Sequence, residues 1–323
     1  MKFKFCHHAI VGTALLAASV VSLAQTTIEF DSLNRKQGFP AILQGRAEYT
    51  DRISGVFTRP DGKSGNFPVM VIMHSSGGII TETWEWSKFF LKMGIATFVV
   101  DSFKPRGIGN STMDQSQISY PASVSDALLA LKVIAAQPGI DSKRIGVIGY
   151  SRGAVAAATS AFENIRAGVL GKDNALKFAL HIAYYGGCSM VGTTTGVPMQ
   201  LFVGDRDNII TPETCGVAVS GLKAKGANVI DYVAYPGALH SFDVQRDKEV
   251  YVANAQSFKG CAGAVQDLDT MDYFIDERKV SSKEYGDYFA TCMTKGYSIG
   301  YNYSAKADSQ KRVAALVAKT FGL

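Results

Sequence analysis

The pentapeptide Gly-Tyr-Ser-Arg-Gly at residues 149–153 constrains the fold of this chain more than any other stretch. It follows an apolar run at 144–148, typical of a short buried strand, and precedes small residues at 154–158 that favour a helix. A serine between these elements occupies a sharp turn, in which side chains two positions away on either side would collide. Glycine at both positions removes the collision. The pattern predicts a strand–turn–helix unit that presents the Ser151 hydroxyl at a helix N-terminus, where N–H groups favour developing negative charge.

A serine in such a turn needs a general base, and the chain has five histidines. His7 and His8 lie in an N-terminal leader, and His181 lies in an apolar run that indicates a core histidine on a central strand. His74 precedes the serine, whereas His240 follows it in a turn after an apolar run. Because serine turns of this type take their partners in the order serine, acid, histidine, His240 is the predicted general base.

The acid is expected between the serine and the histidine, after another strand. Residues 198–203 predict that strand, and Gly-Asp-Arg-Asp-Asn follows at 204–208. Asp207 is favoured because it lies three residues past the glycine, a reach that lets the loop turn toward the histidine. Asp205 stays open as the alternative, although it can instead pair with Arg206 or a neighbouring loop. A carboxylate here would hold the imidazole tautomer and stabilise the imidazolium.

Together with these three residues, the stretches at 100–107 and 235–243 resemble the dienelactone hydrolase family of α/β-hydrolases. The resemblance runs over about residues 45–245 and resumes at the last helix. It implies an α/β-hydrolase fold and hydrolysis of an ester or lactone without a cofactor. In that family the oxyanion is held by the N–H of the residue after the nucleophile, here Arg152, and by a loop N–H that matches Ser76.

The chain departs from the family pattern at two places. Dienelactone hydrolases use a cysteine nucleophile with a nearby glutamate, where this chain has Ser151 and Ser75. They also hold a substrate carboxylate with two arginines; Arg106 can stand in for one, but Val244 occupies the other position. The resemblance therefore implies the fold and the hydrolytic class, and not the dienelactone substrate. Arg106 has the further interpretation of a salt bridge to Asp101 or another loop carboxylate.

Aromatic residues near the predicted oxyanion loop allow two interpretations. Trp84 and Trp86 precede an apolar run at 89–91. Trp84 is a candidate for lining a substrate pocket, but an amphipathic helix packed on the sheet explains the same pattern.

The first 24 residues have the features of a cleavable export signal. Lys2 and Lys4 precede an apolar stretch at 9–21, and Ser22-Leu23-Ala24 supplies the small residues of a cleavage site before Gln25. The apolar stretch is shorter than the ~20 residues that a membrane span needs. We expect a periplasmic or secreted protein of residues 25–323, not bound to a membrane once the leader is removed. The formal net charge of +5 becomes +3 once the two leader lysines are removed. This mild excess, without a basic cluster with interleaved aromatics, argues against a nucleic-acid partner.

The cysteines predict two disulfides. Cys6 belongs to the leader, and an even count in an exported chain favours pairing of the four that remain. Cys188 follows one predicted strand and Cys215 begins the helix after the next, so a Cys188–Cys215 pair is favoured, leaving Cys261 with Cys292. Three pairings are formally possible. The cysteines are dispersed and lack C-x-x-C spacing, which argues against a metal site.

Strand and helix patterns alternate along the chain, which predicts an α/β fold with a mostly parallel sheet and helices on both faces. Strands are expected near 46–58, 68–74, 95–101, 144–150, 178–185, 198–204 and 228–235. Helices are expected near 83–93, 120–136, 152–163, 212–225 and 305–320. Residues 247–300 do not fit the alternation. They are interpreted as an insertion in a single domain, which either covers part of the cleft or decorates the periphery.

The sequence predicts a serine hydrolase that cleaves small esters or lactones through an acyl-serine. Two alternatives stay open. One is a binding protein that keeps the scaffold without catalysis, and the other is a peptidase or acyltransferase that uses the same three residues. Nothing in the sequence sets an oligomeric state.

Overall fold

The computed structural model describes residue 1, residues 25–61 and residues 65–323. The predicted leader of residues 1–24 therefore lies, apart from Met1, outside the described residues. In the described part of the chain, no helix combines the length and the apolar character that crossing a bilayer requires.

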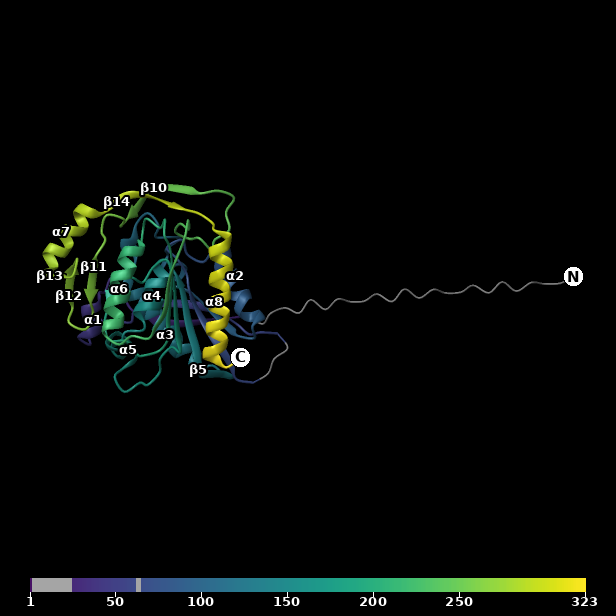
Figure 1. Cartoon of the computed structure of the whole chain (residues 1–323). Helices are drawn as coiled ribbons and strands as arrows, with labels where there is room; N and C mark the ends of the chain where they lie inside the picture. The colour runs from purple at the N-terminus through teal and green to yellow at the C-terminus, as the bar shows by residue number, and fades with distance from the viewer. Residues whose placement is uncertain (2–24, 62–64) are drawn as a thin grey trace.

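An eight-stranded sheet forms the centre of the molecule (Figure 1). In chain order its strands are β1 (Gln25–Ser32), β2 (Asp51–Thr58), β3 (Phe67–Met73), β4 (Ala96–Asp101), β5 (Ile140–Tyr150), β6 (Leu180–Tyr184), β8 (Met199–Gly204) and β9 (Val229–Tyr235). Their spatial order is β1-β2-β4-β3-β5-β6-β8-β9. The pairs β1–β2 and β2–β4 are antiparallel, and every other neighbouring pair is parallel. The predicted mostly parallel α/β sheet is confirmed.

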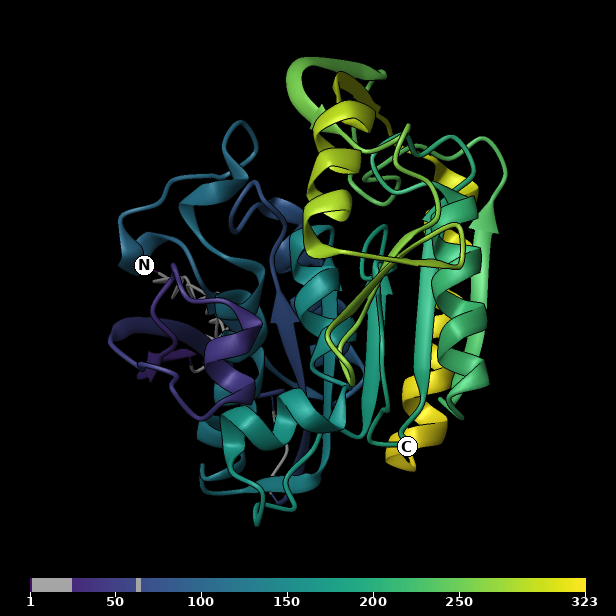
Figure 2. The same ribbon diagram turned by 90° about the vertical axis from the view of Figure 1, so that its left-hand side faces the viewer.

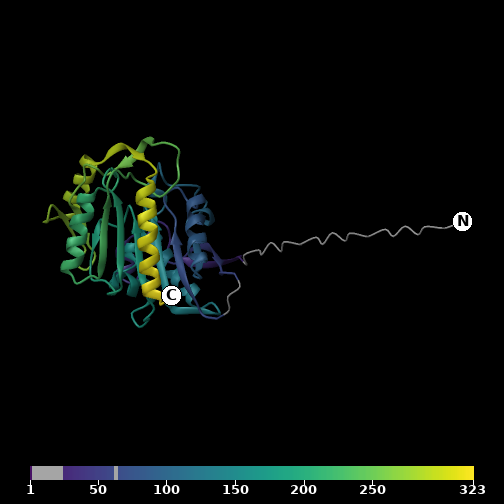
Figure 3. The same cartoon turned by 45° about the vertical axis from the view of Figure 1, so that its right-hand side comes forward.

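Helices cover both faces of this sheet, and Figure 3 shows the C-terminal helix running across one of them. That face carries α2 (Thr81–Lys92) and α8 (Tyr303–Phe321), whose apolar side chains form one buried core. The other core lies under α1 (Phe39–Leu43), α3 (Tyr120–Ala135), α4 (Arg152–Thr159), α5 (Glu163–Leu170) and α6 (Pro212–Ala224). Two single-turn 3₁₀ helices, η1 (Lys104–Arg106) and η2 (Gln115–Gln117), lie in the connection between β4 and α3. We refer to the sheet and these helices as the sheet body.

Two parts of the sheet body differ from the sequence prediction. The edge strand β1 was not predicted, because its residues are mostly polar and exposed and only its partner β2 gives it a register. The helix predicted over 152–163 is two helices, α4 and α5. The chain leaves the helical path between them because Thr195 donates its N–H to Ala161 O (2.8 Å) and Glu163 donates to Thr193 O (2.9 Å).

Residues 247–300, here the 247–300 segment, contribute to two small sheets outside the central one. One lies at the top of the view in Figure 1 and the other at its left, the side that faces the viewer in Figure 2. In one of them β10 (Val250–Ser257) pairs with β14 (Thr294–Ile299). In the other, β11 (Ala264–Asp267), β12 (Asp272–Ile275) and β13 (Arg278–Val280) join β7 (Met190–Val191), a short strand in the connection between β6 and β8. Helix α7 (Ser282–Cys292) follows β13. The structure contains both predicted disulfides, Cys188–Cys215 and Cys261–Cys292.

Candidate active site

Ser151 lies between β5 and α4 in a conformation that few residues other than glycine adopt, with φ 50° and ψ −112°. The two glycines that flank it are required by space. A Cβ at Gly149 would lie 2.0 Å from the Gly153 carbonyl oxygen, and a Cβ at Gly153 would lie 2.2 Å from that of Met73. The backbone therefore forms the tight strand-to-helix turn that the sequence predicts, with the serine at the N-terminus of α4.

A chain of two hydrogen bonds joins three side chains that are far apart in sequence. The Ser151 hydroxyl lies 3.0 Å from His240 Nε2, and His240 Nδ1 lies 2.8 Å from an Asp207 carboxylate oxygen. His240 and Asp207 are each only 3% exposed, so little water competes for these bonds. With the imidazole proton on Nδ1, Nε2 is free to accept the hydroxyl proton. This arrangement can act as a nucleophile, a general base and an orienting acid.

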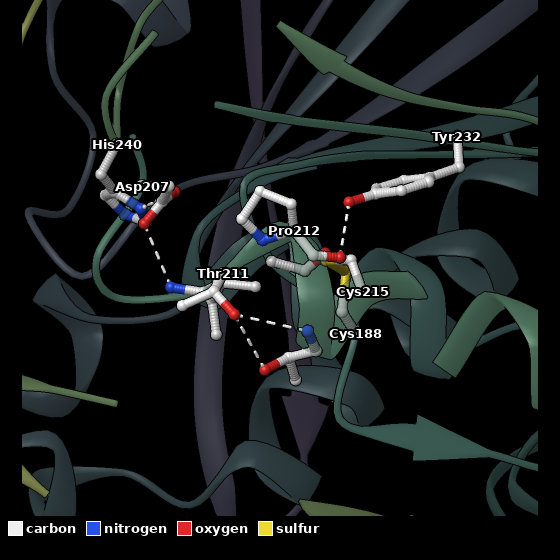
Figure 4. Close-up of a disulfide and its surroundings, with 10 residues drawn as sticks. Cys188, Asp207, Thr211, Pro212, Cys215, Tyr232 and His240 are labelled. Atoms are coloured by element: carbon white, nitrogen blue, oxygen red, sulfur yellow. Dashed lines mark hydrogen bonds and ion pairs between the residues drawn. A yellow bond between two sulfur atoms is a disulfide. The ribbon is translucent and has the colours of Figure 1, made fainter. Parts of the chain in front are cut away.

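The loop after β8 separates the two aspartates. Asp207 turns inward, where its second carboxylate oxygen accepts the N–H groups of Ile209 (2.8 Å) and Ile210 (3.1 Å). Figure 4 shows Asp207 beside His240, at the start of the loop that leads to Cys215. Asp205 is exposed and accepts the N–H of Gly237 (2.7 Å) instead. It joins the loop between β8 and α6, here the acid loop, to the turn after β9 that carries His240, here the histidine turn. This agrees with the interpretation in which Asp205 pairs with a neighbouring loop, and Arg206 lies 3.6 Å from Glu249 instead.

Aromatic rings and a buried carboxyl support the histidine turn. The Tyr185 ring packs edge-on against the His240 ring, with centroids 4.7 Å apart. The Tyr185 hydroxyl (2.8 Å) and the Trp86 indole N–H (2.9 Å) both donate to Asp243, three residues past the histidine. Burial raises the pKa of the Asp243 carboxyl. No local sequence pattern indicates this support, because its members come from three distant parts of the chain.

The two predicted oxyanion donors lie in the cavity that contains Ser151. Ser76 and Arg152 line this narrow space of about 60 Å³ together with the serine. Gln115, which sequence reasoning missed, connects them. Its side-chain oxygen accepts from the Ser76 hydroxyl (3.1 Å) and from Arg152 Nη2 (2.7 Å). One amide thus ties together the loop after β3 and the start of α4.

His74 lies behind the oxyanion loop and has a structural role. Its Nδ1 lies 2.7 Å from the Ser75 carbonyl oxygen, and its Nε2 accepts the N–H of Ser102 (3.2 Å). Burial lowers the pKa of His74, which favours the neutral tautomer that these two bonds need.

A comparison with protein families identifies the chain. The model of the dienelactone hydrolase family matches residues 53–259, which include the turn at Ser151 (here the elbow), the acid loop and the histidine turn. The chain belongs to the dienelactone hydrolase family. Membership supports a hydrolase that acts on ester or lactone bonds. No curated protein matches the chain significantly.

Solved structures of dienelactone hydrolase-like proteins share the fold. A candidate dienelactone hydrolase from Klebsiella pneumoniae is 16% identical, with a TM-score of 0.54 over 91% of this chain and 99% of its own. A dienelactone hydrolase-like promiscuous phosphotriesterase from metagenomic libraries is 15% identical, with a TM-score of 0.52 over 92% of this chain and 99% of its own. At these identities the likeness establishes the α/β-hydrolase fold alone.

Arg106 does not line the cavity that contains Ser151. The interpretation of Arg106 as a substrate-binding residue is therefore wrong. Its side chain is 2% exposed and donates to both carboxylate oxygens of Asp126 (2.7 and 2.9 Å). Its Nε bonds Asp51 at 2.6 Å. The salt-bridge interpretation is correct in kind, but Asp101 is not the partner. Asp101 accepts the N–H groups of residues 103 and 104.

Trp84 also lies away from the cavity, so its interpretation as a pocket residue is wrong. It is half-buried on α2 and packs against the core under α2 and α8. The alternative of an amphipathic helix packed on the sheet explains both tryptophans.

The 247–300 segment touches the site directly. Gln256, Phe258 and Tyr297 line the cavity of Ser151. Gly300 donates its N–H to the His240 carbonyl oxygen (3.2 Å), and Ser298 donates to the Asn208 side chain (3.3 Å) beside the acid. Of the two interpretations left open by the sequence, these contacts favour the one in which the segment covers part of the cleft.

Metal-ligand geometry is not found among the described residues. Within residues 25–61 and 65–323, no group of three or more His, Cys, Asp or Glu side chains is arranged to hold a metal ion.

Proposed function

We propose that this protein is a serine hydrolase that cleaves carboxylic ester or lactone bonds of small substrates through an acyl-serine intermediate. The observation that carries the proposal is the hydrogen-bonded chain from Ser151 through His240 to Asp207. The strained turn at Ser151 supports it, since such strain persists only where the surrounding structure imposes it.

In the acylation step His240 Nε2 takes the hydroxyl proton while Ser151 Oγ attacks the carbonyl carbon. The negative charge that forms on the carbonyl oxygen is stabilised by the main-chain N–H groups of Ser76 and Arg152. Asp207 stabilises the imidazolium without taking the proton. When the carbon–oxygen bond to the leaving group breaks, His240 donates the proton to that oxygen and the alcohol departs.

In the deacylation step water replaces the alcohol. His240 takes a proton from the water as its oxygen attacks the acyl carbon, and a second oxyanion forms against the same two N–H groups. Cleavage of the bond to Ser151 Oγ returns the proton to the serine and releases the acid. The protein's own groups suffice for both steps, so we propose no cofactor.

We further propose that residues 25–323 act as one exported domain, in the periplasm or outside the cell. The leader composition supports export, and the two disulfides are compatible with a secreted protein.

Turnover of short p-nitrophenyl esters tests the proposed function. We expect Ser151→Ala to lower turnover by on the order of 10⁴–10⁶-fold, because a nucleophile is lost while the fold is kept. Ser220→Ala is the matched control, since Ser220 is an exposed serine on α6, and it should retain full turnover. A Ser151→Ala protein that keeps a substantial fraction of wild-type turnover would contradict the proposal. Turnover of aminoacyl amides in preference to esters would move it to a peptidase.

A further inference from the structure

A second cavity continues from the one that contains Ser151. The two cavities share five lining residues, which come from both the sheet body and the 247–300 segment: Tyr120, Val155, Ile209, Ile210 and Phe258. The space beside the serine is narrow, about 60 Å³, whereas the second cavity is about 280 Å³. A substrate held at the serine therefore has room to extend in this direction.

The walls of the second cavity, here the side cavity, are apolar and aromatic. The 247–300 segment contributes Phe258, Tyr285 and Phe289, and none of the residues that line the side cavity carries a charge. Binding sites of this kind take apolar groups, because burial of apolar surface provides the affinity.

The aromatic wall is held together by ring contacts and by a disulfide. The Phe289 ring lies edge-on to the rings of Tyr285 (centroids 5.0 Å apart) and Phe258 (6.0 Å). Cys261, which lines the side cavity, is bonded to Cys292 at the end of α7. The wall is therefore organised before a substrate arrives, which lowers the entropy cost of binding.

The arginines near the cleft are already occupied. Arg106 is buried against Asp126 and Asp51. The Arg152 guanidinium bonds Gln115 and the Ile118 carbonyl oxygen, and it lies over the Tyr120 ring. Among the described residues that line the two cavities, Arg152 is the only charged one, so a substrate carboxylate would lie there without an uncommitted cation.

We propose that the substrates of this enzyme are uncharged esters with an aromatic or similarly bulky apolar group on one side of the ester bond. The side cavity binds that group while the carbonyl lies at Ser151. This inference rests on the proposed hydrolase function. Four of its lining residues, Cys261, Ala264, Tyr285 and Phe289, lie beyond residue 259, where the match to the family model ends.

Matched ethyl and acetate esters test the inference. The kcat/KM of the full mature protein is measured in a pH-stat for ethyl acetate, ethyl 3-phenylpropionate and benzyl acetate. A fourth substrate is the phenylpropionate with a carboxylate on its ring. We expect the preferred phenyl ester, on the acyl or the alcohol side, to exceed ethyl acetate by at least about tenfold. The ring carboxylate should remove that advantage.

Substitutions in the aromatic wall test whether the side cavity causes the preference for the phenyl ester over ethyl acetate. Phe289→Ala should lower the kcat/KM of the phenyl ester far more than that of ethyl acetate, and should so remove most of the advantage of the phenyl ester. Phe289→Leu, which disturbs packing less, should remove part of it. Phe274→Ala is the matched control, because Phe274 belongs to the same segment but lines a different depression.

Labelling of Ser151 by a small fluorophosphonate distinguishes failure of the substrate inference from failure of the proposed hydrolase function. Equal kcat/KM for ethyl acetate and both phenyl esters, in a protein that labels and turns over, would overturn the substrate inference alone. The same holds for a phenyl preference that survives in Phe289→Ala and Phe289→Leu. Absence of both labelling and turnover would overturn the hydrolase function and the inference with it.

Discussion

The sheet body and the 247–300 segment build the same cleft by different physical means. In the sheet body, Ser151, Asp207 and His240 follow strands β5, β8 and β9, which lie between two buried cores. In the segment, α7 has no buried residue, and the residues of the β10–β14 ladder are mostly exposed or half-buried. The segment is held by pairing of β11 with β7, by ring contacts, by a disulfide and by hydrogen bonds to the acid loop and the histidine turn. Of its apolar side chains, Val265 and Leu268 join one of the buried cores. The reacting groups are thus fixed by two packed cores, whereas the wall that meets the substrate is fixed mainly by strand pairing, ring contacts and a disulfide.

This difference predicts two kinds of mutant. Changes in the sheet body should lower turnover of every ester by a similar factor, because all esters use the same reacting groups. Changes in the segment should alter the ranking of esters.

The largest expected effect separates the two aspartates of the acid loop. Asp207→Asn should lower kcat by about 10⁴-fold for all esters, because the imidazole loses the carboxylate that fixes its tautomer. Asp205→Asn is the matched control. It removes only a bond to the Gly237 N–H and should cost far less. Steady-state kinetics on three esters checks both; the opposite ranking would make Asp205 the acid.

The next effect concerns the elbow. Gly149→Ala should lower turnover of all esters by about 10²-fold or more, because its Cβ would lie 2.0 Å from a backbone oxygen and would move the serine. Gly216→Ala, in helix α6, is the control, since nothing lies within 4 Å of its added Cβ. It should leave turnover unchanged and stability equal or slightly higher. A Gly149→Ala enzyme with normal turnover would show that the turn is not tight in solution.

Loss of one disulfide should lower stability and overall turnover, whereas loss of the other should change which esters are preferred. Replacing Cys188 and Cys215 by serine should lower the free energy of unfolding by about 2–4 kcal/mol. It should also reduce turnover of all esters, because Cys215 lies in the first turn of α6, directly after the loop that carries Asp207. Replacing Cys261 and Cys292 should instead change the ranking of esters. Thermal denaturation and ester panels measure these effects. Peptide mapping without reduction that finds free thiols or mixed pairs would contradict the assignment.

The smallest effect concerns the oxyanion loop. Gln115→Ala should lower kcat by less than the ~10²–10³-fold cost of losing an oxyanion donor, with little change in KM, because it loosens both proposed donors without removing either. Gln115→Glu keeps the acceptor oxygen and should restore most of kcat. Gln117→Ala, in the same loop, is the control. An equal change in kcat for Gln117→Ala would assign the effect to general loop stability.

The sequence predicts the elbow and its partners because their signals are local or ordered along the chain. Glycines two residues before and after Ser151 predict the turn. The order serine, acid, histidine along the chain predicts His240 as the base. Arg106 could not be assigned, because its partners Asp51 and Asp126 lie 55 and 20 residues away. Gln115 gave no signal for the same reason. The strand β1 was missed since an edge strand needs few apolar residues.

Mapping the adduct of a fluorophosphonate probe tests the central claim most directly. The folded mature protein is labelled, digested and analysed by mass spectrometry. We predict a single adduct on Ser151, and its loss when His240 is replaced by alanine, because the serine then lacks its base. An adduct on another residue, or a folded protein that takes no label, would contradict the claim that Ser151 is the nucleophile.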